Sequence, residues 1–545
     1  MDLDNLVYVT GHKNPDTDSV ASAIAYAFYK RSKGIHAIPC RLGKLSAETK
    51  YLLNRFGFEE PMLLEDARKK LSEIDLDKPI AVHEDATIQE TLELMKKYKQ
   101  TYIGVVDDDN TFIGIVAKSD FVDIGLDDTA HGIEMLKQTP VSFMAKSISG
   151  QLIYEAPEPH INGKVSIIAI TEKKLENYEI QDRVVILGDD PESQKALIRK
   201  GAGVLISVWT KEYRDDVIET AKEYNCSLII SGHGSMNTSR YIYFAPPVSL
   251  VMTRKFVFFY EDEYVEDTGR RMLEYRFRGF PVLTKEKKLV GYVSRYHVLR
   301  FRNKKIIMVD HNEFSQSVNS IEKAQILEVL DHHRINDFNS NQPVEFRNQI
   351  VGSTAAIITN IFQENRVQIM KEYAGILLGA ILSDTMMFVS PTTTQVDRDA
   401  ANLLAAIADV DIEEFGKELF SAAHSSETTL TEQVMQDVKF FDVHGYKVMI
   451  SQIIAAESNV YLEREKELMA IISNTARKKE LDVFVLAVTG IIDKGSRMYI
   501  AGEKARWLQD AFPNEEGELH SLQEGLLSRK KQIVPKVTEA ISKYA

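Results

Sequence analysis

Short apolar runs alternate with a helical pattern at the start of the chain. Residues 6–10 (LVYVT) and 35–40 (IHAIPC) are predicted strands, and the small and apolar residues of 19–34 between them predict a helix. Strands that alternate with helices indicate a parallel sheet. Such sheets bind ligands beyond the carboxyl ends of their strands, which is where residues 11–18 lie.

The same alternation resumes after residue 302. Segment 304–313 holds a predicted strand that ends in Asp310, and segment 324–334 one that ends in Asp331, His332 and His333. Segments 352–365 and 371–385 are predicted helices. A second α/β lobe begins near residue 425. We therefore expect the two ends of the chain to form one α/β body that the intervening residues interrupt.

A repeat occupies part of the intervening segment. Residues 79–124 and 247–302 each carry an amphipathic helix, an apolar strand, a charged turn, a strand with an early Gly and a final helix. A repeat of this size is a structural unit. Between the copies, residues 130–246 alternate apolar runs with helical patterns, which predicts a small α/β layer domain.

Composition bounds the number of domains and the cellular compartment that we expect. With 545 residues, 44% hydrophobic and 27% charged, the chain has room for several domains and resembles water-soluble proteins. No apolar run is long enough to span a membrane, and the acidic start MDLDNLVYV predicts no secretory signal. Two cysteines, Cys40 and Cys226, argue against a disulfide framework, so we expect a cytoplasmic protein.

The net charge narrows the classes of partner. There are 66 Lys and Arg residues against 80 Asp and Glu residues, which gives −14. This balance argues against broad binding to nucleic acid, which needs a basic face. A small anionic substrate remains compatible, because metal ions or a few cationic side chains can set the local field.

Ligand-type side chains close several of the apolar segments. Carboxylates that converge in one cavity need counter-charge, because their repulsion otherwise forces protonation. His and Asp ligands without Cys suit Mn²⁺, Co²⁺, Fe²⁺, Zn²⁺ or Mg²⁺, and two such ions about 3.5–4 Å apart form a hydrolytic centre for phosphoryl groups. The candidate ligands are His12, Asp16, Asp18, Asp310, His332, His333 and Asp384.

Each candidate also has an ordinary structural explanation. An Asp before a helix is often only its N-cap, which suits the run from Asp16 to Ser19. A single His after a strand is more often a hydrogen-bonded loop residue than a ligand. The ordered set HxxxDxD, VDHN, DHH and SDT, each closing an apolar segment, favours the metal centre over these explanations.

At this point a family resemblance becomes specific. The stretches GHKNPDTDS, VDHN, DHH, ILSDT and SRKKQ (528–532) are similar to the motif set of the DHH phosphoesterase superfamily and, within it, of the manganese-dependent family II inorganic pyrophosphatases. The resemblance covers about 1–65 and 303–545. It implies a parallel-sheet DHH domain, a C-terminal α/β DHHA2 lobe and hydrolysis of pyrophosphate to two phosphates.

The resemblance also implies residue roles. It places His12 and Asp16 on a first metal ion, and Asp18, His332 and Asp384 on a second, with Asp310 bridging both. His333 would contact the substrate and act as acid on the leaving group, while Asp331 would orient the His pair. The implied cofactors are two Mn²⁺ or Co²⁺ ions, with Mg²⁺ arriving with the substrate.

Cationic residues of the C-terminal lobe are the implied phosphate ligands. They are Arg529 and Lys530 of SRKKQ together with Lys439, for which Lys447 is the alternative. SRKKQ by itself could be a solvated basic patch. Pyrophosphate explains it better, because Arg and Lys suit its oxygens and closure of the lobes would exclude water.

The intervening block resembles a pair of CBS domains around a DRTGG domain. The DRTGG match is partial, since the chain reads Asp182-Arg183-Val184 and Gly201-Ala202-Gly203, so no ligand role follows for that motif. The expected domains are 1–70 (first part of the DHH domain), 71–128 (first CBS domain), 129–246 (DRTGG domain), 247–303 (second CBS domain), 304–422 (second part of the DHH domain) and 423–545 (DHHA2 domain).

CBS domains bind adenine nucleotides, and the resemblance therefore implies regulation by AMP or ADP as inhibitors and by ATP or a diadenosine polyphosphate as activators. Each copy keeps half of the motif G-h-x-[ST]-x-x-D: the first has Ala117 and Asp120, the second Ser294 and His297. This favours one shared site, or a bridging dinucleotide, over two equivalent sites. The candidate nucleotide ligands are Ser119, Asp120, Arg276, Arg278 and Ser294.

Arg276 and Arg278 could equally be a basic pair at a helix end. CBS pairs usually associate, so a homodimer or homotetramer is expected. Two other functions stay open: a DHH phosphodiesterase that acts on cyclic dinucleotides or short oligonucleotides, and a non-catalytic nucleotide sensor. The chain lacks a GGG run near its C-terminus, which disfavours the first, and keeps every expected ligand, which disfavours the second.

Overall fold

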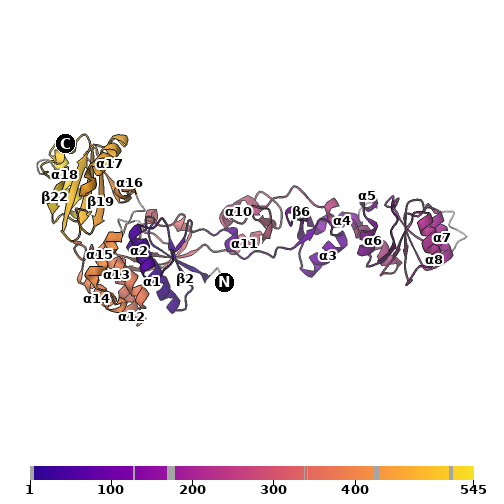
Figure 1. Cartoon of the computed structure of the whole chain (residues 1–545). Helices are drawn as coiled ribbons and strands as arrows, with labels where there is room; N and C mark the ends of the chain where they lie inside the picture. The colour runs from indigo at the N-terminus through magenta and orange to yellow at the C-terminus, as the bar shows by residue number, and fades with distance from the viewer. Residues whose placement is uncertain are drawn as a thin grey trace. The chain divides into compact units, whose positions relative to one another are not determined.

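The computed structural model describes residues 5–126, 129–168, 178–336, 338–340, 342–422, 429–514 and 519–544. The chain divides into two compact units, one of Met1–Lys69 with Arg302–Ala545 and one of Lys70–Phe301 (Figure 1). The first unit is therefore built from both ends of the chain, as the resumed alternation after residue 302 predicts.

The first unit contains a six-stranded parallel sheet in the order β17-β16-β15-β1-β2-β3. The parallel sheet predicted from the sequence is confirmed, although the short strands β3 and β17 escaped prediction. The strand predicted to end in Asp310 ends one residue earlier, at Val309, and the strand predicted to end in Asp331, His332 and His333 ends at Asp331. The strands are β1 (Val7–Thr10), β2 (Ala37–Arg41), β3 (Met62–Leu63), β15 (Lys305–Val309), β16 (Gln325–Asp331) and β17 (Glu345–Asn348).

Helices pack beside this sheet around a large apolar core (Figure 1). Small residues along α1 allow it to lie against α12 and α13. Helix α13 is buried along most of its length because residues 374–382 are all small or apolar. The helices are α1 (Thr17–Ser32), α2 (Ala47–Arg55), α12 (Thr354–Glu364), α13 (Lys371–Asp384), α14 (Gln395–Ala408) and α15 (Ile412–Ala422).

The C-terminal lobe of the first unit has a five-stranded mixed sheet in the order β18-β19-β20-β21-β22. Apolar side chains cover both of its faces. SRKKQ forms a π-helical turn, Arg529–Ile533, that leads into the last helix. The elements are α16 (Leu430–Gln436), β18 (Val438–Val443), β19 (Tyr446–Ala455), α17 (Glu465–Lys478), β20 (Val483–Gly490), β21 (Gly495–Ala501), β22 (Ser521–Glu524) and α18 (Val534–Ser542).

The second unit confirms the predicted repeat. Sheets β4-β5-β6 and β12-β13-β14 have the same pairing, first parallel and then antiparallel. The buried Tyr292 links them, since its hydroxyl donates to Ile80 O (2.6 Å) and accepts from Gly104 N (2.7 Å). The copies comprise β4 (Ala81–His83), α3 (Ile88–Lys97), β5 (Tyr102–Val106), β6 (Phe112–Ala117) and α4 (Lys118–Leu126), then β12 (Phe259–Tyr260), α10 (Val265–Met272), β13 (Phe280–Leu283), β14 (Leu289–Val293) and α11 (Arg295–Arg300).

A third sheet of the second unit, in the order β7-β11-β10-β9-β8, forms the predicted α/β layer. The antiparallel edge strand β7 was not predicted. The apolar run KVSIIAI (164–170), one of the runs that predict this layer, extends past residue 168, where the described range ends. The elements are α5 (Thr129–Lys137), α6 (Val141–Ser147), β7 (Gln151–Tyr154), β8 (Val165–Ile167), β9 (Val184–Leu187), α7 (Pro191–Arg199), β10 (Val204–Ser207), α8 (Asp215–Glu223), β11 (Ser227–Ile230) and α9 (Ser235–Tyr241).

The partial DRTGG motif supports packing in this layer. Asp182 and Gly201 both have positive φ, and the Asp182 N–H donates to Gly201 O (2.7 Å). The Gly203 N–H donates to Arg183 O (3.0 Å). These contacts join the amino ends of β9 and β10, away from the carboxyl edge where ligands of parallel sheets bind.

Two expectations from composition can be compared with the structure. Cys40 and Cys226 are free thiols in buried positions. Within the described ranges, no helix combines the length and apolarity needed to cross a membrane.

Candidate metal centre

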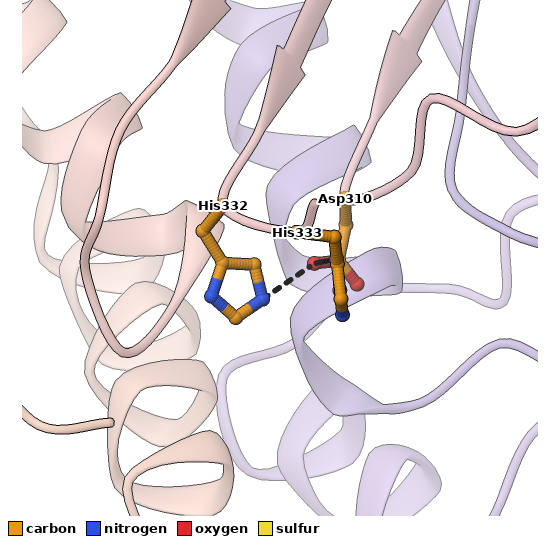
Figure 2. Close-up of side chains that lie close together, drawn as sticks. All are labelled: Asp310, His332 and His333. Atoms are coloured by element: carbon orange, nitrogen blue, oxygen red, sulfur yellow. Dashed lines mark ion pairs between the residues drawn. The ribbon is translucent and has the colours of Figure 1, made fainter. Parts of the chain in front are cut away.

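The predicted ligands gather at the carboxyl edge of the first sheet, where β1, β15 and β16 end side by side. His12 follows β1, Asp310 follows β15, and His332 and His333 follow β16. Figure 2 shows the His332 ring directed toward the Asp310 carboxylate. Helices α1 and α13 supply the remaining candidates.

A first group of ligand atoms contains His12, Asp16 and Asp310, all within 4.8 Å of one another. The His12 Nε2 atom lies 3.1 Å from Asp16 Oδ2 and 3.5 Å from Asp310 Oδ2. Asp16 is also the N-cap of α1, because its Oδ1 accepts from the Ser19 N–H (2.9 Å). The N-cap explanation and the ligand explanation therefore both fit Asp16, since each uses a different carboxylate oxygen.

A second group contains Asp18, Asp310, His332 and Asp384, also within 4.8 Å. His332 Nε2 lies 3.4 Å from Asp310 Oδ1 and 3.6 Å from Asp384 Oδ2. The Nε2 atom is buried and makes no well-formed hydrogen bond. Asp310 belongs to both groups, and each group uses a different one of its two oxygens.

The backbone at Asp310 is in the left-handed region, with φ at +63°, which is uncommon for a residue with a side chain. Asp310 is 1% exposed. Its carboxylate is fixed by the Ser19 hydroxyl at Oδ2 (2.7 Å) and the Thr354 hydroxyl at Oδ1 (3.0 Å). Gly11 permits this approach, because a Cβ there would lie 2.5 Å from the Ser19 Cβ.

Asp18 is held by the first turn of α12. Its Oδ2 accepts from the Thr354 N–H (2.6 Å) and its Oδ1 from the Ala355 N–H (3.0 Å). The buried Asp397, which sequence reasoning missed, supports this turn by accepting from the Gly352 N–H (2.8 Å to Oδ2). The sequence signal was the capping box Thr394-x-x-Asp397 before α14.

Asp331 organises the His pair, in agreement with its expected role. Its Oδ1 accepts from the backbone N–H groups of His332 (2.8 Å) and His333 (3.1 Å), and lies 2.9 Å from His333 Nδ1. The Asn312 amide donates to Asp331 Oδ2 (2.5 Å). His332 Nδ1 lies 3.1 Å from Val351 O, so Nδ1 supplies the proton of this hydrogen bond and Nε2 is the nitrogen that faces Asp310 and Asp384.

The carboxylates of the site are crowded enough to need compensating positive charge. Burial, followed by the Asp310 carboxylate, raises the pKa of Asp18 to about 7, and burial with Asp18 and Asp16 raises the pKa of Asp384 well above its ordinary value. Burial lowers the pKa of His332, but the carboxylates of Asp310 and Asp18 raise it by more, so that the net pKa is about 10. Without metal, protons must compensate the crowded carboxylates. The oxygen and imidazole donors therefore fit two divalent ions.

The cationic candidates lie on the C-terminal lobe. Arg529 Nη1 lies 2.8 Å from Asp437 Oδ2 and donates to Asp437 O (2.8 Å), two residues before Lys439 on β18. Lys447 lies at the opposite, turn end of the β18–β19 hairpin, paired with Asp442. In the described part of the chain, no hydrogen bond or ion pair joins Arg529, Lys530 or Lys439 to the Asp310 carboxylate.

The nucleotide candidates of the second unit are partly engaged in caps. Asp120 Oδ2 accepts from the Ala117 N–H (2.8 Å), and His297 Nδ1 accepts from the Ser294 N–H (3.0 Å). His297 thus takes over the capping contact of the acid that it replaces. Ser119 is exposed and lies 3.4 Å from Asp120 Oδ1.

Arg276 and Arg278 are exposed in the loop between α10 and β13. Arg295, which sequence reasoning passed over although it lies in GYVSRYH, holds this loop by donating to Met272 O (3.0 Å) and Phe277 O (3.0 Å). Arg295, at the start of α11, therefore holds the conformation of this loop, and the side chains of Arg276 and Arg278 remain exposed to solvent.

Comparison with known proteins agrees with this architecture. The model of the DHH family, N-terminal domain, matches residues 6–381, and that of the DHHA2 domain matches residues 417–540. The fold and site thus define a member of the DHH class of metal-dependent hydrolases with a DHHA2 lobe and a long insert.

Full-length relatives narrow the class. The chain is 34% identical to the cobalt-dependent inorganic pyrophosphatase of Clostridium perfringens, over 99% of each chain, and 33% identical to a probable manganese-dependent inorganic pyrophosphatase of Thermotoga maritima, over 98% of each. A solved structure of the CBS and DRTGG domains of the Clostridium perfringens enzyme with the activator diadenosine tetraphosphate covers 42% of this chain and 100% of that one, at 25% identity and a TM-score of 0.38. The chain belongs to the family of manganese- and cobalt-dependent inorganic pyrophosphatases.

Proposed function

We propose that this chain hydrolyses inorganic pyrophosphate to two phosphates at a dinuclear metal centre. The observation that carries the proposal is the pair of ligand groups that share the two oxygens of Asp310. His12 and Asp16 would hold one Mn²⁺ or Co²⁺ ion, and Asp18, His332 and Asp384 the other. Two such ions lower the pKa of a shared water and polarise the phosphoryl group.

The protein's own residues supply the geometry. The hydroxyls of Ser19 and Thr354 keep the Asp310 carboxylate from rotating, so both of its oxygens face fixed directions. His333 is about half exposed, whereas Asp331 beside it is buried and holds its Nδ1. Its side chain is therefore open enough to reach a bound substrate, where it would protonate the departing phosphate.

Cationic residues of the C-terminal lobe would bind the phosphate groups. Arg529 is kept in place by Asp437 and still has donors for phosphate oxygens, with Lys530 following it on the π-helical turn. Lys439 lies near this turn, whereas Lys447 lies at the far end of its hairpin. The position favours Lys439 as the substrate lysine. Closure of this lobe over the metal centre would exclude water, and Mg²⁺ would arrive with pyrophosphate.

Regulation by adenine nucleotides is the second part of the proposal. AMP or ADP would inhibit and ATP or a diadenosine polyphosphate would activate, through Ser119, Asp120, Arg276, Arg278 and Ser294. The half-motif in each copy supports one shared or bridging ligand. A ligand shifts the rate only if it binds the more and less active arrangements with different affinity, typically by about 1–3 kcal/mol.

A loop of the first unit offers a route for this coupling. The chain passes into the second unit after Lys69. Just before that point, Asn319 Nδ2 donates to Glu65 O (3.0 Å) and Asn319 O accepts from the Ala67 N–H (2.9 Å). The same loop reaches the metal centre, because Gln316 O accepts from the Lys13 N–H (2.7 Å). Residues 316–319 thus contact residues 65–67, just before the chain enters the second unit, and Lys13, which lies between the proposed ligands His12 and Asp16.

The remaining expectations belong to this proposal. We propose the six domain ranges given above for this chain. We also propose that it forms a homodimer or homotetramer through the CBS pairs and that it works in the cytoplasm, where it would sense adenine nucleotides.

Phosphate release from pyrophosphate tests the proposal. We expect activity with Mn²⁺ or Co²⁺, loss of activity after chelation and recovery when either ion is restored. Rates measured with each nucleotide in turn test the regulatory part, and equal rates with all of them would end it. Hydrolysis of cyclic dinucleotides in place of pyrophosphate would favour the phosphodiesterase alternative, and no hydrolysis at all would favour the sensor.

A further inference from the structure

The carboxylate of Glu48 connects two of the segments that carry proposed metal ligands. Glu48 Oε1 accepts from the Thr17 hydroxyl (2.5 Å) and from the Ser383 hydroxyl (2.6 Å). Thr17 stands between Asp16 and Asp18 at the start of α1. Ser383 precedes Asp384 at the end of α13. One oxygen therefore ties together two chain segments that are more than three hundred residues apart in sequence.

Glu48 is itself fixed. It lies in the first turn of α2, where the helix dipole favours an acid, and the Ser46 side chain caps that helix by accepting from the Thr49 N–H (3.1 Å). The Thr49 hydroxyl also lies 3.2 Å from the Thr17 hydroxyl. Thr17 and Thr49 are both almost fully buried, so the hydroxyl of Thr17 has little access to water as an alternative acceptor.

The position of Glu48 bears on the second ligand group. Asp18 and Asp384 are two carboxylates of one ligand group, so they repel each other when both are ionised, and they would share the second metal ion. The residue next to each of them is anchored to Glu48. If that anchor were lost, repulsion could move the end of α13 away from the start of α1, and the ligand atoms would separate.

We propose that Glu48 is a positioning residue that sets the distance between Asp18 and Asp384 and thereby the affinity of the second metal ion. This inference rests on the proposed dinuclear centre and adds a residue outside the ligand set. Partners beyond the direct ligands commonly change metal affinity or activity by about 10- to 100-fold.

The alternative is that Glu48 has a purely structural role and only stabilises α2. Helix α2 has a second tether that allows the two ideas to be separated: Glu418 on α15 accepts from the Tyr51 hydroxyl (3.0 Å) and pairs with Arg55. Glu418→Ala removes a carboxylate that holds the same helix, without touching Thr17 or Ser383. It is the matched control.

The test is a titration of the metal-free full-length protein with Co²⁺, followed by the visible absorption of the bound ion and by calorimetry. We expect wild type and Glu418→Ala to bind two ions alike. Glu48→Ala should bind one of the two ions about 10- to 100-fold less tightly and change the absorption of that ion. Glu48→Gln should recover most of the affinity, because its amide oxygen can still accept from both hydroxyls.

Ser383→Ala provides a second variant in case Glu48→Ala does not fold, and it should also weaken one ion. Equal affinities in wild type, Glu48→Ala and Ser383→Ala would overturn the inference and leave the dinuclear centre intact. Equal losses in Glu48→Ala and Glu418→Ala would also overturn it, in favour of the stability of α2. Failure of the wild type to bind two ions would instead contradict the proposed function.

Discussion

The metal centre and the repeated domains use the same kinds of polar residue in opposite ways. At the metal centre, Asp18 and Asp310 accept hydrogen bonds from α12, which is remote from Asp18 in sequence. In the repeats, Asp120 and His297 accept from backbone groups only three residues away. Hydrogen bonds between distant segments bring several side chains together at one site. A local cap only stabilises the helix to which the residue belongs.

This difference explains why one set of motifs was more informative than the other. A residue that caps its own helix meets a structural need, so its presence says little about a ligand. Asp310 has the reverse character, since its left-handed backbone and burial are unfavourable unless the surroundings compensate them.

Asp310→Asn should abolish activity. The substitution removes the charge that both ligand groups share, so both ions are affected at once. We expect a loss greater than the roughly 100-fold typical of residues outside the ligand set, measured as phosphate release with saturating Mn²⁺. Adenine nucleotide affinity, measured by calorimetry, should be unchanged. Activity near that of the wild type would refute the bridging role.

Asp16→Asn should have a smaller effect, because only one group contains this residue and its carboxylate is about half exposed. An Asn side chain can still accept from the Ser19 N–H, so α1 should keep its cap. We expect at least about 10-fold weaker binding of one metal ion, with nucleotide binding intact. Loss of metal and nucleotide binding together would argue against separate modules.

Lys439→Ala and Lys447→Ala form a matched pair on one hairpin. A lost hydrogen bond to a charged group is worth about 1.5–3 kcal/mol, so Lys439→Ala should lower kcat/KM by about 10- to 100-fold. Lys447→Ala should stay close to wild type. Steady-state kinetics with pyrophosphate at fixed Mg²⁺ decide the matter, and the reverse ranking would assign the role to Lys447.

Asp120→Ala should have the smallest effect on catalysis and act on regulation. We expect the ratio of the rates with and without nucleotide to move toward one, within the roughly 5- to 150-fold range of ordinary coupling. Glu93→Ala, an exposed acid on α3 of the same copy, is the control. If the two variants respond to nucleotide alike, Asp120 serves only as a cap.

Much of the architecture could be predicted from the sequence. Long segments of small and apolar residues, such as α1, α12 and α13, and the buried strands of the first sheet carry strong patterns, and the repeat is visible as self-similarity. Strands β3, β7 and β17 escaped because two to four residues at a sheet edge have no clear period. Their pairing depends on tertiary neighbours.

The candidate ligands could also be named from the sequence, but their supports could not. The Val351 carbonyl that orients His332 and the backbone N–H groups of α12 have no side-chain signature. Glu48 looks like an ordinary first-turn acid of an amphipathic helix. Only the three-dimensional structure shows that its neighbours Thr17 and Ser383 lie beside proposed ligands.

Anomalous diffraction from crystals of the full-length protein grown with Mn²⁺ tests the central claim most directly. We predict two peaks about 3.5–4 Å apart, one beside His12 and Asp16 and one beside Asp18, His332 and Asp384, with an oxygen of Asp310 on each. A single peak, or two peaks of which one lacks Asp310, would contradict the dinuclear centre.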